Sequence, residues 1–337
     1  MTIDLRSDTI TRPTAEMKDA MMNAELGDDV FGEDPSIKAL EAYAASLLGK
    51  EAALFCPSGT MTNQIGINVH TSPGDELICD STSHTYRFEA GGMAFHSGVS
   101  VYPLEGDRGR ITADQVKSAI QAPNAHFPKS RLVVLENTHN KGSGSIYDKQ
   151  EVDAIGRLCQ EQGLRFHLDG ARLFNAVVAS GISAKEWSEP FDSVSICLSK
   201  GLGAPVGSVL VGDEDFIREA HRKRKVFGGG MRQAGIIAAG GLYALENHID
   251  RLKEDHRKAR KLGEALEQNP QVEEVAPIDT NIVVATLKAG KTPKEQLQDW
   301  EKKGVKAVPF GDQQIRLVTH IDVTEKKHEK ALELLKG

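Results

Sequence analysis

The sequence predicts an α/β protein in which a large domain with a mostly parallel sheet is followed by a smaller C-terminal α+β domain. Between about residues 50 and 212, short β-rich runs alternate with amphipathic helical segments, a pattern typical of a parallel sheet covered by helices on both faces. After Gly230 this alternation stops and a long helical stretch follows. The 337 residues suffice for two domains, and we place them at 1–247 and 248–337.

The strands and helices of the first part can be placed from local signals. Thr112 with Gln115 forms a capping box, and Asp148 with Glu151 marks a similar helix start. The helix that begins after Asp148 is expected to end at Gly163, a usual C-terminal residue. Six strands are expected, at Ala52–Phe55, Glu76–Cys79, Leu132–Leu135, Arg165–Leu168, Val194–Leu198 and Ser208–Val211.

The second part is predicted to begin with one long helix over Arg232–Glu267 that connects to the smaller domain. That domain is expected to contain strands near Asn281–Thr286 and Gln314–Val318 and a final helix from about Thr324. Residues 1–14 are expected to form an arm of the large domain that reaches the functional site.

Composition and charge exclude several classes of protein. The net charge of −7 argues against a nucleic-acid binder, and no apolar run reaches the ~18 residues of a membrane span. The N-terminus has neither the basic lead nor the apolar stretch of a signal peptide. No cluster of ligand residues suggests a metal ion. We expect a cytoplasmic protein with neither nucleic-acid nor membrane partners, whose scattered cysteines are reduced core residues: Cys56, Cys79, Cys159 and Cys197.

A candidate phosphate site follows the first strand, where Ser58, Gly59 and Thr60 precede a helix in "CPSGTMTNQIGI". Free N–H groups at a helix start favour a phosphate group, although an N-cap without a ligand is the alternative. The motifs of nucleotide sites do not occur: no G-x-G-x-x-G follows this strand, and "AGKT" has Ala285 where a P-loop needs glycine. The expected phosphate is therefore not that of ATP or a dinucleotide.

Two charged residues are expected at neighbouring strand ends. Asp169 emerges from the strand in "RFHLDGARLFNA", and Lys200 follows "SICLS" in a loop rich in glycine. A buried carboxylate needs a cationic partner; this could be Arg172, in a purely structural ion pair, or the protonated ring nitrogen of a cofactor. Lysine in such a loop is usually solvated. Ligands of these sheets bind beyond the carboxyl ends of the strands. Pyridoxal 5'-phosphate requires a phosphate cup, a carboxylate and an amine at that place.

These residues carry a resemblance to a known family. The sequence is similar, nearly from end to end, to the low-specificity L-threonine aldolases, which are fold-type-I pyridoxal-phosphate-dependent enzymes of the transferase-like fold. The matching motifs are "DLRSDTITRPT", "GDDVFGEDP", "SGTMTNQI", "SHTYRFEAGG", "ENTHN", "HLDGARLFNA", "CLSKGLGAPVGS", "GGGMRQAG" and "IRLVTHID".

The resemblance implies how the cofactor is held. Lys200 would bind it as a Schiff base, Asp169 would pair with its pyridine nitrogen, and His84 would lie against its ring. Arg232 would reach the phosphate from a neighbouring subunit. This role would explain the basic run "HRKRKVFGGGMR", which could otherwise be a solvated helix end. The remaining cofactor residues are the phosphate cup of Ser58, Gly59 and Thr60, together with Arg172.

The resemblance also implies a substrate site. Ser7, Arg172 and Arg316 match residues that hold the amino-acid carboxylate, a role suited to an arginine fork. His126 matches a histidine near the substrate hydroxyl, and Phe31 stands where many relatives have tyrosine.

The implied reaction is retro-aldol cleavage of L-threonine, L-allo-threonine and other β-hydroxy-α-amino acids to glycine and an aldehyde. His84, His126 or a water molecule between them would act as the base. Another fold-type-I enzyme, a β-eliminating lyase or an aminotransferase, would share Lys200 and Asp169, and a non-catalytic binding protein would bind no coloured cofactor. The family further implies a homotetramer with sites shared between subunits.

Overall fold

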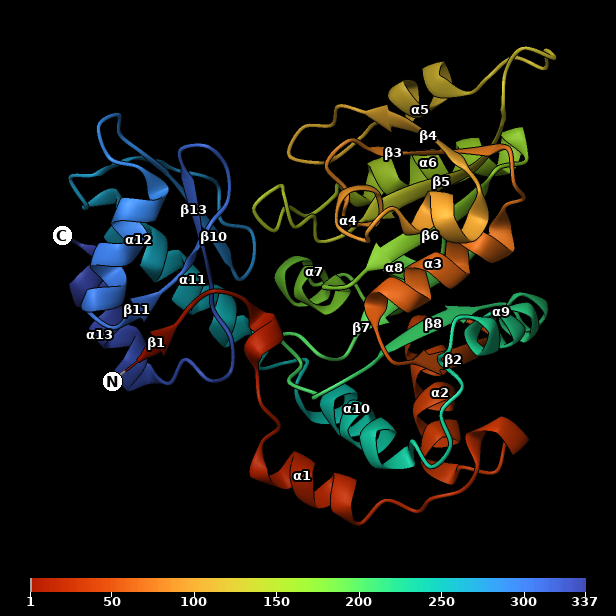
Figure 1. Ribbon diagram of the computed structural model, residues 1–337, viewed down its shortest axis with the longest axis horizontal. Coiled ribbons are helices and arrows are strands. Elements are labelled where there is room, and N and C mark those ends of the chain that lie inside the picture. Colours follow the sequence, from red (N-terminus) through yellow and green to blue (C-terminus); the bar gives the residue numbers. More distant parts are fainter. Residues whose placement is uncertain (1) are drawn as a thin grey trace.

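The computed structural model describes residues 2–337, which form a large unit and a smaller unit beside it (Figure 1). The large unit is built on a seven-stranded sheet with the order β2-β8-β7-β6-β5-β3-β4. Neighbours from β7 to β4 are parallel, whereas β8 is antiparallel to both β7 and β2. The strands are β2 (Ala52–Cys56), β3 (Asp75–Asp80), β4 (Ser100–Leu104), β5 (Lys129–Glu136), β6 (Arg165–Gly170), β7 (Ser193–Cys197) and β8 (Ser208–Gly212).

The mostly parallel sheet and its six expected strands are confirmed. The seventh strand, β4, was missed because it lies at the edge of the sheet, where its residues are partly or fully exposed and Pro103 is tolerated. An exposed edge strand lacks the continuous apolar run that marks the buried strands.

Helices cover both faces of this sheet (Figure 1). The capping box of Thr112 and Gln115 is confirmed, and Gly163 ends its helix in the left-handed conformation with φ of 67°. Asp148 caps its helix by accepting a hydrogen bond from the N–H of Gln150. The Glu151 side chain does not take part in this cap and accepts a hydrogen bond from the N–H of Ala113 in α5. The helices are α1 (Ala15–Met22), α2 (Pro35–Leu48), α3 (Gly59–His70), α4 (His84–Arg87), α5 (Ala113–Ala119), α6 (Lys149–Gln162), α7 (Leu173–Ser180), α8 (Ala184–Ser188) and α9 (Glu214–Val226), with short turns η1 (Asp8–Ile10), η2 (Asp29–Phe31) and η3 (Met93–Ser97).

The expectation of one long helix after Arg232 is wrong, because the structure has two helices, α10 (Gly235–Asn247) and α11 (Leu252–Glu267). The turn between them needs neither glycine nor proline, since His248 and Arg251 keep φ and ψ near the helical region. The His248 ring bonds to the carbonyl of Leu202 at 2.7 Å and fixes the change of direction. Helix α10 then packs on the large unit and α11 on the small one.

The small unit contains a four-stranded antiparallel sheet in the order β12-β13-β10-β9. Its two expected strands and its final helix, capped by Thr324, are confirmed. The elements are β9 (Val272–Val275), β10 (Ile282–Leu287), α12 (Pro293–Lys302), β11 (Val305–Lys306), β12 (Val308–Pro309), β13 (Gln314–Val318) and α13 (Glu325–Leu335).

The first strand of the chain, β1 (Ile3–Asp4), belongs to this C-terminal unit. It pairs in parallel with β11, so that Ile3 lies opposite Val305, and the side chains of Ile3 and Leu5 are buried in the second hydrophobic core. The red strand among the blue elements shows this crossing in Figure 1. As a result, Ser7 and Asp8 leave the small unit in the direction of the large one.

All four cysteines are buried and unbridged, as expected for core residues. Within residues 2–337, no helix combines the length and the apolar character needed to cross a membrane.

Candidate active site

The candidate site lies at the carboxyl ends of β5, β6 and β7. These three strands are parallel neighbours, so their ends meet at one edge of the sheet. Asp169 is the penultimate residue of β6 and pairs with Ser195 of β7, and Lys200 follows β7 by three residues. The two residues that the sequence placed at strand ends are therefore at adjacent ends.

Asp169 is buried, with 1% of its surface exposed, and each oxygen of its carboxyl group accepts one hydrogen bond. Oδ2 accepts from Nδ2 of Asn63 at 3.0 Å and Oδ1 from the N–H of Ala171 at 3.1 Å. His84 and Glu89 each bring a polar atom within 4.8 Å of the carboxylate. Asn63 Nδ2 also donates to Glu89 Oε1 at 2.9 Å, so one amide group holds both carboxylates.

His84 begins helix α4 and is held from two sides. Its backbone N–H donates to Oε2 of Glu136 at 2.7 Å, and its Nδ1 bonds to Oε1 of Glu89 at 3.1 Å. Burial lowers the pKa of His84, but the Glu89 hydrogen bond and the charges of Asp169 and Glu136 outweigh it, so that the pKa is raised. The ring is one-third exposed and lies beside the buried Asp169.

The predicted phosphate cup is formed by the first turn of α3. Ser58 is the N-cap and accepts from the N–H of Met61 at 3.2 Å. The N–H groups of Gly59 and Thr60 have no hydrogen-bond partner among the described residues, and Ser58 and Thr60 are exposed. A Cβ at position 59 would stand 2.5 Å from Sγ of Cys197, so glycine lets α3 start directly over β7.

Helix α3 connects the cup to Asp169 on one face of the sheet. Gly59 lies against Cys197 of β7, and Asn63, about 6 Å further along the helix axis, bonds to Asp169 of β6. The unpaired N–H groups of the cup and the Asp169 carboxyl group thus lie on the same face of the sheet, which fits a flat ligand with a phosphate at one end and a protonated nitrogen at the other.

Lys200 has a fixed backbone and an unpaired amine. Its carbonyl accepts from Oγ1 of Thr11 at 2.9 Å and from the N–H of Gly203 at 2.8 Å. Its Nζ has no hydrogen-bond or ion-pair partner within residues 2–337. The amine lies near Asp8: burial would raise the pKa of Asp8, but Arg172 and, to a smaller extent, Lys200 hold it well below its usual range.

Arg172 pairs with Asp8, which excludes the structural pair with Asp169 considered from the sequence. Its Nε and Nη2 donate to the two carboxylate oxygens at 2.8 and 2.7 Å, and both side chains are buried. Asn281 of the small unit donates to the same carboxylate at 3.2 Å. Asp8 therefore connects the two units at the site.

Arg316 and Ser7 lie at the small unit's side of the site. Arg316 Nη1 donates to Oδ1 of Asn140 at 2.9 Å and Nη2 to the carbonyl of Arg6 at 3.2 Å, while its Nε is buried without a partner among the described residues. Burial and the charge of Arg172 lower the pKa of Arg316 to about 10. Two neighbouring guanidinium groups with an unused donor fit a carboxylate. Ser7 caps the turn η1 through its Oγ.

Three expected site residues are not brought to this place within one chain. His126 lies in an exposed loop before β5, at the amino end of that strand and thus at the opposite edge of the sheet from Asp169. Arg232 is exposed and pairs with Asp28 at 2.9 Å. Phe31 is 73% exposed.

The basic segment before Arg232 divides into two parts. Arg224 is buried and structural: it donates to Asp29 at 2.6 Å and to the carbonyl of Phe55 at 2.7 Å. The other basic side chains of this segment remain at the surface. These side chains belong to His221, Arg222, Lys223 and Lys225. Together with Val30 and Gly230 they line a hollow of about 580 Å³.

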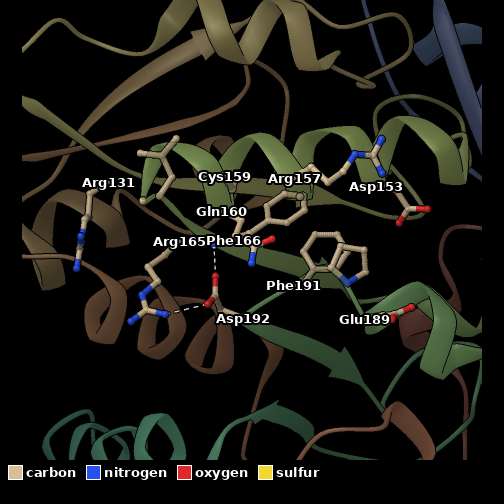
Figure 2. A pocket seen from close by; sticks show the side chains of 14 residues that line it. Arg131, Asp153, Arg157, Cys159, Gln160, Arg165, Phe166, Glu189, Phe191 and Asp192 are labelled. Carbon is tan, nitrogen blue, oxygen red and sulfur yellow. Dashed lines mark hydrogen bonds and ion pairs between the residues drawn. The ribbon is translucent and has the colours of Figure 1, made fainter.

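A different cavity, of about 770 Å³, contains none of the candidate residues (Figure 2). It is lined by Arg131 of β5 and by Arg165, the first residue of β6, whose Nη1 donates to Asp192 at 2.9 Å. These residues lie at the amino ends of their strands. The cavity is therefore at the opposite edge of the sheet from Asp169.

Several residues of the site were missed from the sequence: Asp8, Asn63, Glu89, Glu136 and Asn140. All five lie within motifs that carry the resemblance: Asp8 follows Ser7 in the first of them, and Asn63 lies one helical turn after Gly59. Glu89 lies in "SHTYRFEAGG", and Glu136 and Asn140 are the first and last residues of "ENTHN". The motifs were therefore a usable signal, but the partners of these side chains depend on the fold.

Comparisons with known proteins agree with this architecture. The model of the beta-eliminating lyase family matches residues 4–289. The low specificity L-threonine aldolase of Escherichia coli (strain K12) is 44% identical over 329 residues, covering 96% of each chain. The low-specificity L-threonine aldolase 1 of Arabidopsis thaliana is 40% identical over 96% of this chain and 92% of its own. This chain belongs to the low-specificity L-threonine aldolase family.

The fold has the same relatives. A structure described as Leishmania major threonine aldolase superposes with a TM-score of 0.86, covering 99% of this chain and 98% of its own at 22% identity. The architecture is that of fold-type-I pyridoxal-phosphate enzymes. Members of this family are pyridoxal-phosphate-dependent lyases.

Proposed function

We propose that this protein cleaves L-threonine, L-allo-threonine and other β-hydroxy-α-amino acids to glycine and an aldehyde, with pyridoxal 5'-phosphate as cofactor. The observation that carries the proposal is the placement of Asp169, the phosphate cup and the unpaired amine of Lys200 around one edge of the sheet. The identity to threonine aldolases over nearly the whole chain supports the choice of reaction.

The cofactor would be held at three places. The N–H groups of Gly59 and Thr60, with the Ser58 hydroxyl, bind its phosphate; Lys200 binds it covalently through Nζ; and Asp169 accepts a hydrogen bond from its protonated ring nitrogen. Bound pyridoxal phosphate supplies a conjugated acceptor for the electrons released at the substrate's α-carbon.

The substrate carboxylate would be held by Arg172, Arg316 and Ser7. The unused Nε of Arg316 and the proximity of the two guanidinium groups support this role. Asp8 keeps Arg172 in one orientation through two hydrogen bonds. A fixed carboxylate determines the rotation about the substrate's Cα–N bond, and with it which bond at Cα breaks.

The base would take the proton of the β-hydroxyl group as the Cα–Cβ bond breaks. Cβ then becomes the carbonyl carbon of the aldehyde, and Cα receives a proton to give glycine. His84 lies beside Asp169 and is one-third exposed, whereas His139 and His167, which are also near Asp169, are fully buried. A water molecule held by His84, or His126, could act in its place.

The complete site would need a second subunit. Arg232, His126 and the exposed Phe31 lie away from the Lys200 site of their own chain, and each would instead serve the site of a neighbour in a homotetramer. The exposed ring of Phe31 is suited to such a contact. We further propose a cytoplasmic location and the domain division 1–247 and 248–337. The two separate hydrophobic cores support two domains, but Ile3 and Leu5 of the arm pack in the core of the small unit and Leu252 packs in that of the large one.

The test is incubation of the purified, cofactor-loaded protein with L-threonine and with L-allo-threonine. We expect acetaldehyde and glycine in equal amounts and no keto acid, whereas a β-eliminating lyase or an aminotransferase would form a keto acid. The Lys200→Ala variant is the control. A protein that forms a keto acid, or that cleaves neither substrate, would contradict the proposal.

A further inference from the structure

A continuous line of hydrogen bonds runs from Asp169 into the interior, away from the substrate. Asn63 Nδ2 donates to Asp169 at 3.0 Å, and Asn63 Oδ1 bonds to Nε2 of His167 at 3.3 Å. His167 Nδ1 bonds to Oγ of Ser193 at 2.8 Å, and the same Oγ bonds to Nε2 of His70 at 2.7 Å. None of these four residues was expected to have a function.

The donors in this line all point towards Asp169. Asn63 Nδ2 faces two carboxylates, Asp169 and Glu89, which only accept when ionised. Its Oδ1 must therefore face His167, so Nε2 of His167 carries the hydrogen and Nδ1 accepts from the Ser193 hydroxyl. This leaves the oxygen of Ser193 to accept from Nε2–H of His70.

The histidines are neutral, as this arrangement requires. Burial lowers the pKa of His167 to about 4 and that of His70 well below its ordinary value. Each ring then has one N–H and one acceptor nitrogen, and every atom that takes part in the line has a hydrogen-bond partner although 7% or less of each residue is exposed. Interior polar groups are tolerated only when they are satisfied in this way.

The backbone provides the space and the spacing for this line. His167 and Asp169 are two residues apart on β6 and face the same side, and His167 pairs with Ser193 of β7. A Cβ on Gly66 of α3 would stand 2.9 Å from Cε1 of His167. Glycine at position 66 thus allows the imidazole ring to lie between the helix and the sheet.

We propose that His167, together with Asn63, Ser193 and His70, is a positioning network that keeps the Asp169 carboxylate ionised and directed at the ring nitrogen of the cofactor. If His167 did not donate, the Asn63 amide could turn, and its oxygen would face two carboxylates. Asp169 would then gain a proton more readily and would hold the ring proton less firmly. The inference rests on the proposed cofactor role of Asp169.

Other titratable groups also lie near Asp169. They are His84, Glu89, Glu136 and His139. Burial lowers the pKa of both histidines, but hydrogen bonds and charges of the surrounding carboxylates, Asp169 included, outweigh it and raise both pKa values. Among the residues that touch Asp169, Asn63 is the side chain that donates to it and is itself fixed from behind.

The test uses two pairs of variants, each loaded with cofactor labelled with ¹⁵N in the ring. Ser193→Ala removes the hydroxyl that fixes the His167 tautomer. Ser195→Ala, on the same strand and the same face, removes an equally buried hydroxyl whose one hydrogen-bond partner within residues 2–337 is Thr62. His167→Phe removes the donor to Asn63, whereas His167→Gln keeps an N–H near the position of Nε2.

The readouts are the ¹⁵N chemical shift of the ring nitrogen as a function of pH, the visible absorbance of the loaded protein, and kcat and KM. We expect His167→Phe and Ser193→Ala to lose the ring proton at lower pH than the wild type, by about one pH unit for His167→Phe, with kcat reduced about tenfold and KM changed little. Ser195→Ala and His167→Gln should behave like the wild type.

Equal titration midpoints in Ser193→Ala, His167→Phe and Ser195→Ala would overturn the inference. If His167→Phe fails to fold, the two alanine variants, which each lose one oxygen atom, decide the question. A wild-type protein without visible absorbance and without a protonated ring nitrogen would contradict the proposed function instead.

Discussion

The substitution Asp8→Asn tests whether the arm, the large unit and the small unit are joined electrostatically at the site. Asp8 has no exposed surface and binds Arg172 with two hydrogen bonds, while Asn281 and Lys200 also face it. Asparagine keeps the size of the side chain but removes its charge. Arg172 is then left buried and charged without its counter-ion.

The expected loss of stability is large. Removing one partner of a buried ion pair costs about 3–5 kcal/mol. An unfolding entropy of about 2.1 cal/mol/K per residue, taken over 337 residues, is about 0.7 kcal/mol/K. The melting temperature of Asp8→Asn should therefore fall by about 4–7 °C.

The same arm offers a matched control. Asp4 pairs with Arg6 at 2.6 Å, but this pair is at the surface, where ion pairs contribute about 0–1 kcal/mol. Asp4→Asn should shift the melting temperature by about 1 °C or less. Thermal unfolding followed by circular dichroism measures both variants, and equal shifts would refute the assignment of Asp8 as the buried counter-ion of Arg172.

The dependence on pH adds a second check. Because the folded-state pKa of Asp8 is held below its usual value near 3.8, its contribution is fully present above that pH and is lost as the pH falls towards the folded-state value. The difference in stability between wild type and Asp8→Asn should therefore be constant near neutral pH and shrink in acid. A difference that grew below pH 3.8 would contradict this sign.

Three further predictions concern the reaction. Lys200→Ala should abolish the visible band of the cofactor-loaded protein, as measured by absorbance; a variant that kept this band would show that another group binds the cofactor. Arg316→Gln should raise KM for threonine about ten- to a hundredfold, because a charge-assisted hydrogen bond to the carboxylate is lost, and unchanged steady-state kinetics would remove Arg316 from the substrate site. Glu89→Gln should move the acid limb of the profile of kcat/KM against pH to lower pH. The Glu89 hydrogen bond helps to raise the pKa of His84 above 6.5, and only neutral His84 can accept a proton. An acid limb that stays in place would exclude His84 as the base.

The sheet could be predicted because its central strands are short, buried, β-rich runs bounded by turns and helix caps. The same signal placed Asp169 and Lys200 at strand ends, since a charged residue that directly follows a buried run must emerge at the edge of the sheet. Strand β4 lacks that run because it is exposed. The break between α10 and α11 lacks a signal because its residues keep nearly helical torsion angles.

The partners of the predicted residues could not be found in the same way. Arg172 pairs with Asp8, which is 164 residues earlier in the sequence, and Asn63 and His167 meet across 104 residues. Such pairs depend on how a helix lies over a sheet, and no local pattern encodes that. The site residues recognised from the sequence were those within long matching motifs.

The pairing of β1 with β11 has a consequence for how the protein is made. Ile3 leaves the ribosome near the start of synthesis, but its partner Val305 is added about 300 residues later. At the ~5–20 residues per second of translation, the first segment waits at least about fifteen seconds before it can dock. Ser7 and Asp8 are attached to that segment, so all strands of the central sheet are synthesised before the arm that carries these two residues can dock on the small unit.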